Sequence, residues 1–287
     1  MSALFKNSVG SSLFSLNSLL ILGCCLALPC SSPLTASAQS QSEDVQWTAV
    51  APSLEIGVAE LSSGLFPGEI TLLRSDLKKL RPRVVPAKSL GRNRGNTEWF
   101  AKKTGASLCV NGNFFGKDGK ALGLVVSKGV KHHPIQMGGA LLTGLFLVSR
   151  DKLAIVPRED KREEFGLEAL QGGPRLIASG KPIVNDLVSN SQSRRSGICL
   201  TSDTEFIIFV ASSTLRGATL PELAQVLSLP SVGCQDALNL DGGGSTQLYV
   251  SAELEGAMAD FNGINVAGRD DVPTALCLFP PPNPSPG

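Results

Sequence analysis

The sequence predicts an α+β fold: a single domain of mixed, mostly antiparallel sheet with a few helices. Three observations predict this fold class. Short segments rich in Val, Ile, Leu and Phe recur along the chain and are bounded by Gly, Asp, Ser or Lys, as strands are. Helical patterns are found in two segments. The strands come in clusters and do not alternate with helices, which argues against repeated βαβ units.

Each element has its own signal in the chain. The first helix is expected over residues 96–104, where Trp99, Phe100 and Lys103 have helical spacing. The second helix is expected to begin with the Thr-Leu-Pro-Glu of residues 219–222, because Thr-x-x-Glu is the form of a capping box and proline is tolerated in a first turn. The strands are expected, in chain order, at residues 55–61, 70–73, 107–110, 123–126, 141–148, 205–211, 247–250 and 274–279.

The N-terminal segment has the pattern of a secretory signal. Lys6 gives it a weakly basic start, an apolar run covers residues 13–28, and an Ala-x-Ala cleavage site ends at Ala38. We therefore expect residues 1–38 to be removed, which leaves no membrane span and a secreted or periplasmic protein. A lipid anchor at Cys24, within Leu-Gly-Cys, is the less favoured alternative.

The rest of the chain is expected to form one domain. Residues 39–50 are polar and predict a flexible lead-in, residues 51–279 predict the domain, and the Pro-rich residues 280–287 predict an unstructured or extended tail. The chain has 26 basic and 25 acidic residues, and loss of Lys6 with the signal makes them equal. This balance gives no electrostatic attraction to nucleic acid or to an anionic membrane, so an anionic substrate must be held by local groups.

Four cysteines remain after the signal: Cys109, Cys199, Cys234 and Cys277. An exported chain can oxidise them, and four cysteines allow three pairings. Three of them lie inside apolar runs, which is equally typical of buried free thiols. Disulfides and free thiols therefore both remain open, and the spacing excludes a cysteine metal site.

Several catalytic signatures are missing from the sequence. Residues 112–117 lack one residue of a phosphate loop, and the chain has neither a Gly-x-Ser-x-Gly elbow nor a His-Glu-x-x-His helix. The two histidines, His132 and His133, are adjacent, which excludes a multi-histidine metal site. We expect no cofactor, whereas a bound cation stays open because Asp241 beside Asn239 would permit one.

Glycine-rich segments at the ends of apolar runs carry the polar residues from which a site can be built. Asn111 and Asn113 flank Gly112, and their two amides can hold sugar hydroxyls; the alternative is a plain turn. Gly172 and Gly173 precede a proline and permit close approach of a ligand to the main chain, with a tight loop as the alternative.

Two further segments carry charge. Arg195 offers a planar donor fork suited to carboxylate or phosphate, unless it belongs with Arg194 to a solvated charge cluster. Asp241, in Asn-Leu-Asp-Gly-Gly-Gly-Ser-Thr, is suited to act as base, nucleophile or ligand. A β-turn needs fewer glycines, so a functional role is favoured for the residues that follow, whose main-chain N–H groups can face an anion: Gly242, Gly243, Gly244, Ser245 and Thr246.

Together these segments resemble the phosphodiester glycosidase family, in order over residues 54–278. Asn-Gly-Asn-Phe-Phe looks like the family's Asn-Gly-(Gly/Asn)-Phe-Phe element, and the Gly-Gly-Pro and Arg-Ser-Gly-Ile segments are similar to its Gly-Pro loop and its arginine strand. The closest stretch is residues 220–246. Two departures are a shift of the small residue and glycine of the arginine strand, to Gly197 and Cys199, and the Arg-Asp-Asp-Val of residues 269–272, where a second basic residue or proline is more usual.

The resemblance implies an exported hydrolase that cleaves the glycosidic bond of a sugar-1-phosphodiester, such as an N-acetylglucosamine-1-phosphodiester. Asp241 would be the main catalytic carboxyl, because a phosphodiester is a weakly basic leaving group, for which one carboxylate can dominate. Arg195 would pair with the phosphate. Asn111, Asn113 and the glycine backbones would orient the sugar. The candidates for a second carboxylate are Glu60 and Asp260.

Two other functions compete with this hypothesis. A non-catalytic envelope protein for exopolysaccharide or cell-wall handling would bind glycan through the same asparagines and glycines. The joint presence of Asp241, Arg195 and Ser245 argues mildly against it, since binding alone needs no such group. A phosphodiesterase that cuts P–O instead of C–O is the weaker alternative.

Overall fold

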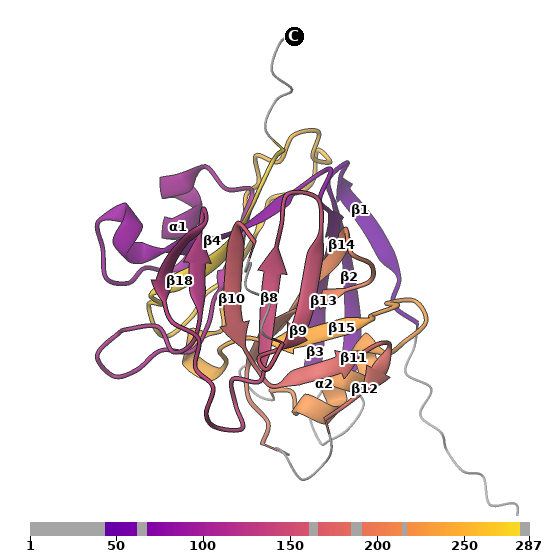
Figure 1. The fold of residues 1–287 in the computed structure, drawn as a ribbon. Coiled ribbons are helices and arrows are strands. Elements are labelled where there is room, and N and C mark those ends of the chain that lie inside the picture. Colours follow the sequence, from indigo (N-terminus) through magenta and orange to yellow (C-terminus); the bar gives the residue numbers. More distant parts are fainter. Residues whose placement is uncertain (1–43, 62–67, 161–165, 185–190, 214–216, 282–287) are drawn as a thin grey trace, which may run out of the picture. The chain divides into compact units, whose positions relative to one another are not determined.

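The computed structural model describes residues 44–61, 68–160, 166–184, 191–213 and 217–281, which form three sheets (Figure 1). The expected signal peptide and the alternative lipid anchor at Cys24 lie outside the described residues. The eight-stranded sheet has the order β1 (Trp47–Ala51), β2 (Leu54–Leu61), β3 (Gly68–Asp76), β14 (Glu205–Ala211), β13 (Arg195–Leu200), β15 (Asp236–Asn239), β11 (Arg175–Ala178) and β12 (Lys181–Pro182).

The other two sheets have five strands each. One has the order β7 (Val130–His133), β6 (Val125–Ser127), β10 (Glu168–Gly172), β8 (Gly144–Val148) and β9 (Leu153–Pro157). The other has the order β17 (Ile264–Val266), β16 (Leu248–Val250), β5 (Leu108–Asn111), β18 (Thr274–Phe279) and β4 (Arg81–Pro86).

Every strand pairing among the described residues is antiparallel, which confirms a mostly antiparallel fold but not a mixed sheet. The α+β class is confirmed in part, because the helical content described is small. It consists of two eight-residue α-helices, α1 (Thr97–Thr104) and α2 (Leu220–Leu227), and two 3₁₀ turns, η1 (Ala87–Leu90) and η2 (Gly243–Ser245).

Both helices begin where the sequence predicts. The Asn96 side chain accepts a hydrogen bond from Trp99 N at the start of α1, and the helix ends at Gly105 in the left-handed region. Thr219 and Glu222 form both hydrogen bonds of a capping box at the start of α2.

The main core lies between the three sheets, and the central strands of the large sheet are buried on both faces. On β14, Ile208 belongs to the core shared by the sheets, whereas its neighbour Phe209 packs with α2. Figure 1 shows α2 beside β11 and β12. Residues from all three sheets meet in the shared core, including Leu73, Ile198, Leu238, Phe146, Leu170, Leu108 and Leu276.

All eight expected strands are present, but the lead-in prediction is wrong for residues 47–50. They belong to β1, which pairs with β2. Trp47 fixes this edge strand, because its Nε1 donates to Ser231 O at 2.8 Å and the Arg74 guanidinium lies 4.0 Å from its ring centroid. Residues 39–43 of the lead-in and 282–287 of the tail lie outside the described residues, and residues 280–281 are in no strand.

The open question about the cysteines is answered by two disulfides, Cys109–Cys277 and Cys199–Cys234. Cys109 and Cys277 face each other across β5 and β18. All four cysteines are buried, so the apolar runs around them belong to the core.

Removing the Cys109–Cys277 disulfide by Cys109→Ala with Cys277→Ala is expected to lower the free energy of unfolding by about 3–5 kcal/mol. The bond spans 168 residues, so its loss releases a long loop in the unfolded chain. The matched variant that lacks Cys199–Cys234, which spans 35 residues, is expected to lose about 2–4 kcal/mol. Urea unfolding followed by tryptophan fluorescence measures both, and a larger loss for the shorter loop would contradict this explanation.

Candidate functional site

The turn at residues 239–246 begins at the end of β15, an inner strand of the eight-stranded sheet. Leu240 is fully buried in the shared core and anchors the turn. Asp241 N donates to Gly112 O at 3.2 Å, which joins the turn to the segment that follows β5. Gly243 has a φ of 60°, in the left-handed region that glycine adopts without strain. The chain therefore presents Asp241 at the edge of the core.

The Asp241 carboxyl is partly shielded from water and is hydrogen-bonded within its own turn. Gly242 N donates to Oδ1 at 2.9 Å, and the Ser245 side chain also bonds the carboxyl. Burial raises the pKa of Asp241 above its ordinary value, these two hydrogen bonds lower it, and the negative charge of Asp270 raises it. The net effect is a raised pKa, so Asp241 keeps its proton to a higher pH than an exposed aspartate does.

The Asn111 side chain was expected to point into a cleft, but it hydrogen-bonds the turn that carries Asp241. Its Nδ2 donates to Asp241 O at 2.7 Å, and its Oδ1 lies 2.8 Å from Ser196 Oγ and accepts from Gln247 N at 3.1 Å. The side chain is fully buried. The predicted contact of Asn111 with sugar hydroxyls therefore needs correction: these bonds occupy both polar atoms of the amide, and its role is to hold the backbone of Asp241.

Asn113 differs from Asn111 in having an unpartnered atom. Its Nδ2 donates to Leu122 O at 2.9 Å, while its buried Oδ1 has no hydrogen-bond partner among the described residues. Asn239 Oδ1 and Thr246 Oγ1 share this property. Buried polar atoms are nearly always partnered, so orphaned atoms on the two segments that meet at Asp241 indicate a place for a polar ligand or water.

Gly172 and Gly173 serve packing rather than the expected ligand approach. Gly173 N donates to Asn239 O at 2.7 Å, and Asn239 Nδ2 donates to Gly173 O at 2.8 Å. A Cβ on Gly172 would lie 2.8 Å from Asn239 O, and one on Gly173 would collide with Leu141 O. Before the cis Pro174, Gly172 thus lets the chain lie directly against the strand that leads to Asp241, and Gly173 lets it lie against Leu141 and Thr143.

Arg195 lies beside the turn and is not part of a solvated cluster. Its Nε donates to Ala218 O at 3.2 Å and its Nη2 to Ser191 O at 2.9 Å. A Cβ on Gly242 would lie 3.7 Å from its Nη1. Burial lowers the pKa of Arg195, but a guanidinium remains charged in proteins. A fixed positive charge therefore lies next to the residue that follows Asp241.

The sequence analysis did not predict that two side chains, Arg194 and Gln247, bind main-chain oxygens of the turn and of the segment beside it. Arg194 Nη2 donates to Thr246 O at 2.8 Å and to Ala267 O at 2.7 Å. Burial, with the charge of Arg269, lowers the pKa of Arg194. Gln247 Nε2 donates to Ser245 O at 3.2 Å and to Asp270 O at 2.9 Å. In the sequence, the adjacent Arg194 and Arg195 are typical of a solvated surface cluster, and no pattern indicates a role for Gln247.

The two candidates for a second carboxylate are not brought to Asp241 by the described contacts. Glu60 is exposed on β2, and β3, β14 and β13 lie between that strand and β15. At about 4.8 Å per strand this separation is about 19 Å. Asp260 is exposed in the loop between β16 and β17. The carboxylate beside the turn is Asp270, which the sequence analysis did not select.

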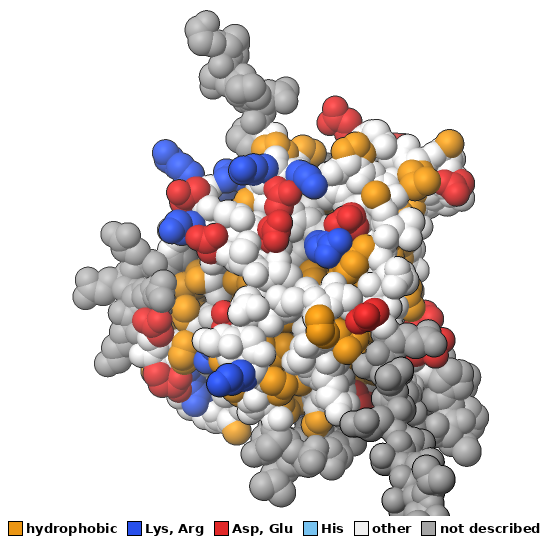
Figure 2. Space-filling model, turned by 90° about the vertical axis from the view of Figure 1, so that its right-hand side faces the viewer, with side chains coloured by type: hydrophobic (Ala, Val, Ile, Leu, Met, Phe, Trp, Pro, Cys, Tyr) orange, Lys and Arg blue, Asp and Glu red, His pale blue; other side chains and the backbone are white. Residues whose placement is uncertain are grey.

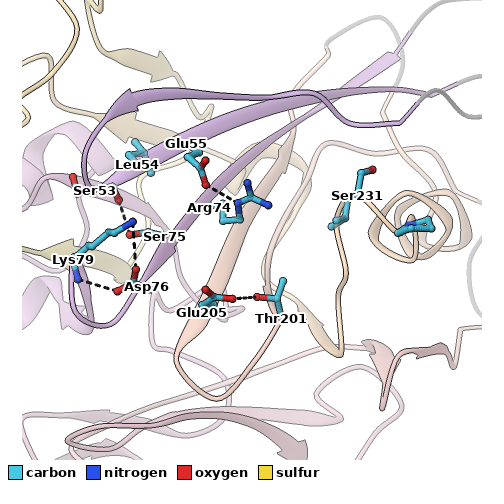
Figure 3. Close-up of a pocket in the computed structure, with 12 residues that line it drawn as sticks. Ser53, Leu54, Glu55, Arg74, Ser75, Asp76, Lys79, Thr201, Glu205 and Ser231 are labelled. Atoms are coloured by element: carbon cyan, nitrogen blue, oxygen red, sulfur yellow. Dashed lines mark hydrogen bonds and ion pairs between the residues drawn. The ribbon is translucent and has the colours of Figure 1, made fainter.

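A separate polar cleft of about 340 Å³ lies over β2, β3 and β14 (Figure 3). It contains the Arg74–Glu55 ion pair at 2.7 Å and the Lys79–Asp76 ion pair at 3.5 Å. None of the predicted site residues lines it. Figure 2 shows the side of the protein that bears β1, with acidic and basic side chains interspersed and no patch of one sign.

Within the described ranges, no three His, Cys, Asp or Glu side chains are grouped so that they could hold a metal ion. A search of the same residues finds no helix both long and apolar enough to cross a membrane.

The fold and the site define a sheet-rich protein in which a partly buried carboxyl with a raised pKa lies on a glycine turn beside an arginine. The chain belongs to the phosphodiester glycosidase family, whose model matches residues 104–279, and the resemblance seen in the sequence is thereby confirmed. N-acetylglucosamine-1-phosphodiester alpha-N-acetylglucosaminidase of Bos taurus is 25% identical over 262 residues, which cover 80% of this chain and 48% of the bovine protein. The chain thus spans about half the length of this curated relative.

Solved structures show the same fold. The catalytic domain of zebrafish N-acetylglucosamine-1-phosphodiester alpha-N-acetylglucosaminidase, auto-inhibited by its pro-peptide, matches with a TM-score of 0.59 and 17% identity, over 83% of this chain and 89% of that one. A hypothetical protein from Synechocystis matches with a TM-score of 0.58 and 16% identity, over 84% of this chain and 65% of that one.

Proposed function

We propose that this chain is an exported hydrolase that cleaves the glycosidic bond of a sugar-1-phosphodiester resembling an N-acetylglucosamine-1-phosphodiester. The observation that carries the proposal is that Asp241, a partly buried carboxyl with a raised pKa, precedes Gly242, beside which the Arg195 guanidinium lies. Membership of the phosphodiester glycosidase family supports the reaction class. Two disulfides support export, because such bonds persist in oxidising compartments.

In this proposal Arg195 binds the phosphate and Asp241 gives a proton to the oxygen that leaves the sugar. The arginine has a fixed position before substrate arrives, so it stabilises the charge that develops on the phosphate without first reorganising. Asp241 retains a proton to higher pH than an exposed aspartate, which suits a general acid. The free Oδ1 of Asn113 and the main-chain N–H groups of residues 242–246 would orient the sugar and its phosphate.

The test is an assay of the oxidised protein, expressed without residues 1–38, against a panel of sugar-1-phosphodiesters. We expect release of free sugar and a phosphate monoester from at least one member of the panel. Binding of glycans measured by calorimetry, with no hydrolysis of any member, would contradict the proposal and support a glycan-binding protein for exopolysaccharide or cell-wall handling.

Arg195→Lys is expected to lower kcat/KM for a sugar-1-phosphodiester by about 10²–10³-fold, because a lysine cannot reproduce a two-nitrogen contact with phosphate. For an aryl glycoside of the same sugar, which has no phosphate, the expected loss of kcat/KM is much smaller. Arg74→Lys, in the separate cleft, is the matched control and should leave both rates unchanged. An equal loss on both substrates would show that Arg195 acts only through the fold.

A further inference from the structure

The segment between β17 and β18 meets the glycine turn. It reads Arg-Asp-Asp-Val at residues 269–272. Arg269 N and Asp270 N both donate to Gly244 O, at 2.7 and 3.1 Å. The backbone of this segment is therefore fixed against the turn that carries Asp241.

The Asp270 side chain lies over Gly244. A Cβ added to Gly244 would collide with Asp270 Oδ2, so the glycine makes room for the carboxylate. Gln247 Nε2 holds the same residue by donating to Asp270 O at 2.9 Å. Two main-chain hydrogen bonds and one from the Gln247 side chain thus fix the backbone of this segment, and the absence of a side chain at Gly244 makes room for the exposed Asp270 carboxylate.

Asp270 and Arg195 flank opposite ends of the turn. Arg195 Nη1 lies beside Gly242, whereas the Asp270 carboxylate lies beside Gly244. Asp270 raises the pKa of Asp241 through its charge and not through a hydrogen bond, so the two carboxyl groups are near each other without direct contact. Inverting glycosidases use two carboxyl groups that lie apart, with a water molecule between them.

We propose that Asp270 is the second carboxylate of the site and activates the water that attacks the sugar; this inference rests on the proposed glycosidase function. The water oxygen bonds to the anomeric carbon while one of its protons passes to Asp270. The bond from that carbon to the phosphate oxygen breaks, and the oxygen keeps the electron pair and takes the proton of Asp241. The products are a sugar of inverted configuration and a phosphate monoester, and solvent then restores both carboxyl groups.

Asp270→Asn tests this role, with Asp271→Asn as the matched control because Asp271 is the exposed neighbour. On a substrate that the wild type cleaves, Asp270→Asn is expected to lower kcat by about 10²–10⁴-fold, and Asp271→Asn by less than about 3-fold. Loss of the Asp270 charge should also move the alkaline limb of the pH–rate profile to lower pH, because the pKa of Asp241 falls. Azide, which attacks without a base, should restore turnover to Asp270→Ala and give a glycosyl azide of inverted configuration.

Three results would overturn the inference: a wild-type rate in Asp270→Asn, an equal loss in Asp271→Asn, or a first-formed sugar that retains its configuration by NMR. Failure of the proposed function looks different, because the wild type would then cleave no member of the panel. In that event a ¹³C NMR titration of Asp241 still tests whether the Asp270 charge acts on the Asp241 carboxyl. A pKa of Asp241 that is lower in Asp270→Asn supports it, and an unchanged pKa overturns it.

Discussion

Asp241→Asn is expected to lower kcat by about 10²–10⁴-fold while leaving the folded protein as stable as the wild type, or more stable, at neutral pH. The amide keeps the shape of the side chain but has no proton to give to the leaving oxygen. Its carbonyl oxygen can still accept from Gly242 N, which donates to Asp241 Oδ1 in the wild type. The turn should therefore retain its geometry.

The stability part of this prediction follows from the direction of the pKa shift. Burial raises the pKa of Asp241 in the folded protein above its value in the unfolded chain. The folded state then binds the proton more tightly, and its stability falls as the pH rises from the unfolded pKa through the folded one. Once the pH exceeds the folded pKa, the ionised carboxylate costs stability, and asparagine removes this cost.

Thermal unfolding at pH 7 and at acid pH measures this effect on stability, and an activity assay measures kcat. The unfolding temperature of Asp241→Asn should equal or exceed that of the wild type at pH 7, and the difference should vanish in acid. Asp236→Asn is the control, because Asp236 is a half-buried carboxylate on β15, the strand that leads to Asp241, and it pairs with Arg175 at 3.5 Å. Full activity in Asp241→Asn would refute the assignment.

Asn111→Ala is expected to lower the free energy of unfolding by about 3–5 kcal/mol, because three buried hydrogen bonds are lost and a buried donor left without a partner costs about 1–3 kcal/mol. The lost amide bonds Asp241 O, Ser196 Oγ and Gln247 N; Gln247 N is left unpartnered, whereas Ser196 Oγ and Asp241 O keep the 2.9 Å bond between them. The Asp241 backbone also loses an anchor, so kcat should fall by about 10²-fold for a shift of about 1 Å.

Asn113→Ala is the matched control for this change. Asn113 is also a buried amide of the same segment, but it makes one hydrogen bond, to Leu122 O, and its Oδ1 is orphaned. The expected loss in the free energy of unfolding is about 1–2 kcal/mol. Its main effect should be a higher KM if Oδ1 contacts the sugar. Urea unfolding measures the stability of both variants, and steady-state kinetics measures kcat and KM. An equal loss of stability in Asn111→Ala and Asn113→Ala would contradict the difference in their hydrogen bonding.

Local signals predicted much of the fold. The capping box at Thr219 and the apolar run of residues 205–211 depend on neighbouring residues, and both elements are present. The strands that were missed have patterns that long-range contacts override. Pro82 and Pro86 argue against a strand, yet β4 tolerates them because it lies at the edge of its sheet. The polar segment at Trp47 becomes β1 only through Ser231 and Arg74.

The sequence singled out segments that the fold brings together at one turn, but it did not predict how their side chains are bonded there. Sequence order brought Asn111, Arg195 and Asp241 together as candidates, and the described contacts place all three at one turn. Asn111 Oδ1 bonds Ser196 and Gln247 and so does not face a ligand. The sequence could not predict these bonds, because the pairing of the strands brings the three residues together. Asp270 was noted only as a departure from the family pattern, because nothing local shows that Gly244 leaves space for it.

Hydrolysis in ¹⁸O-labelled water tests the central claim, cleavage of the glycosidic C–O bond, most directly. The phosphate monoester is the decisive product, because the anomeric hydroxyl of free sugar can itself exchange with water. Mass spectrometry of early time points should find unlabelled phosphate monoester, and labelled sugar above the level of free sugar incubated alone. Label in the phosphate would show P–O cleavage and would contradict the account.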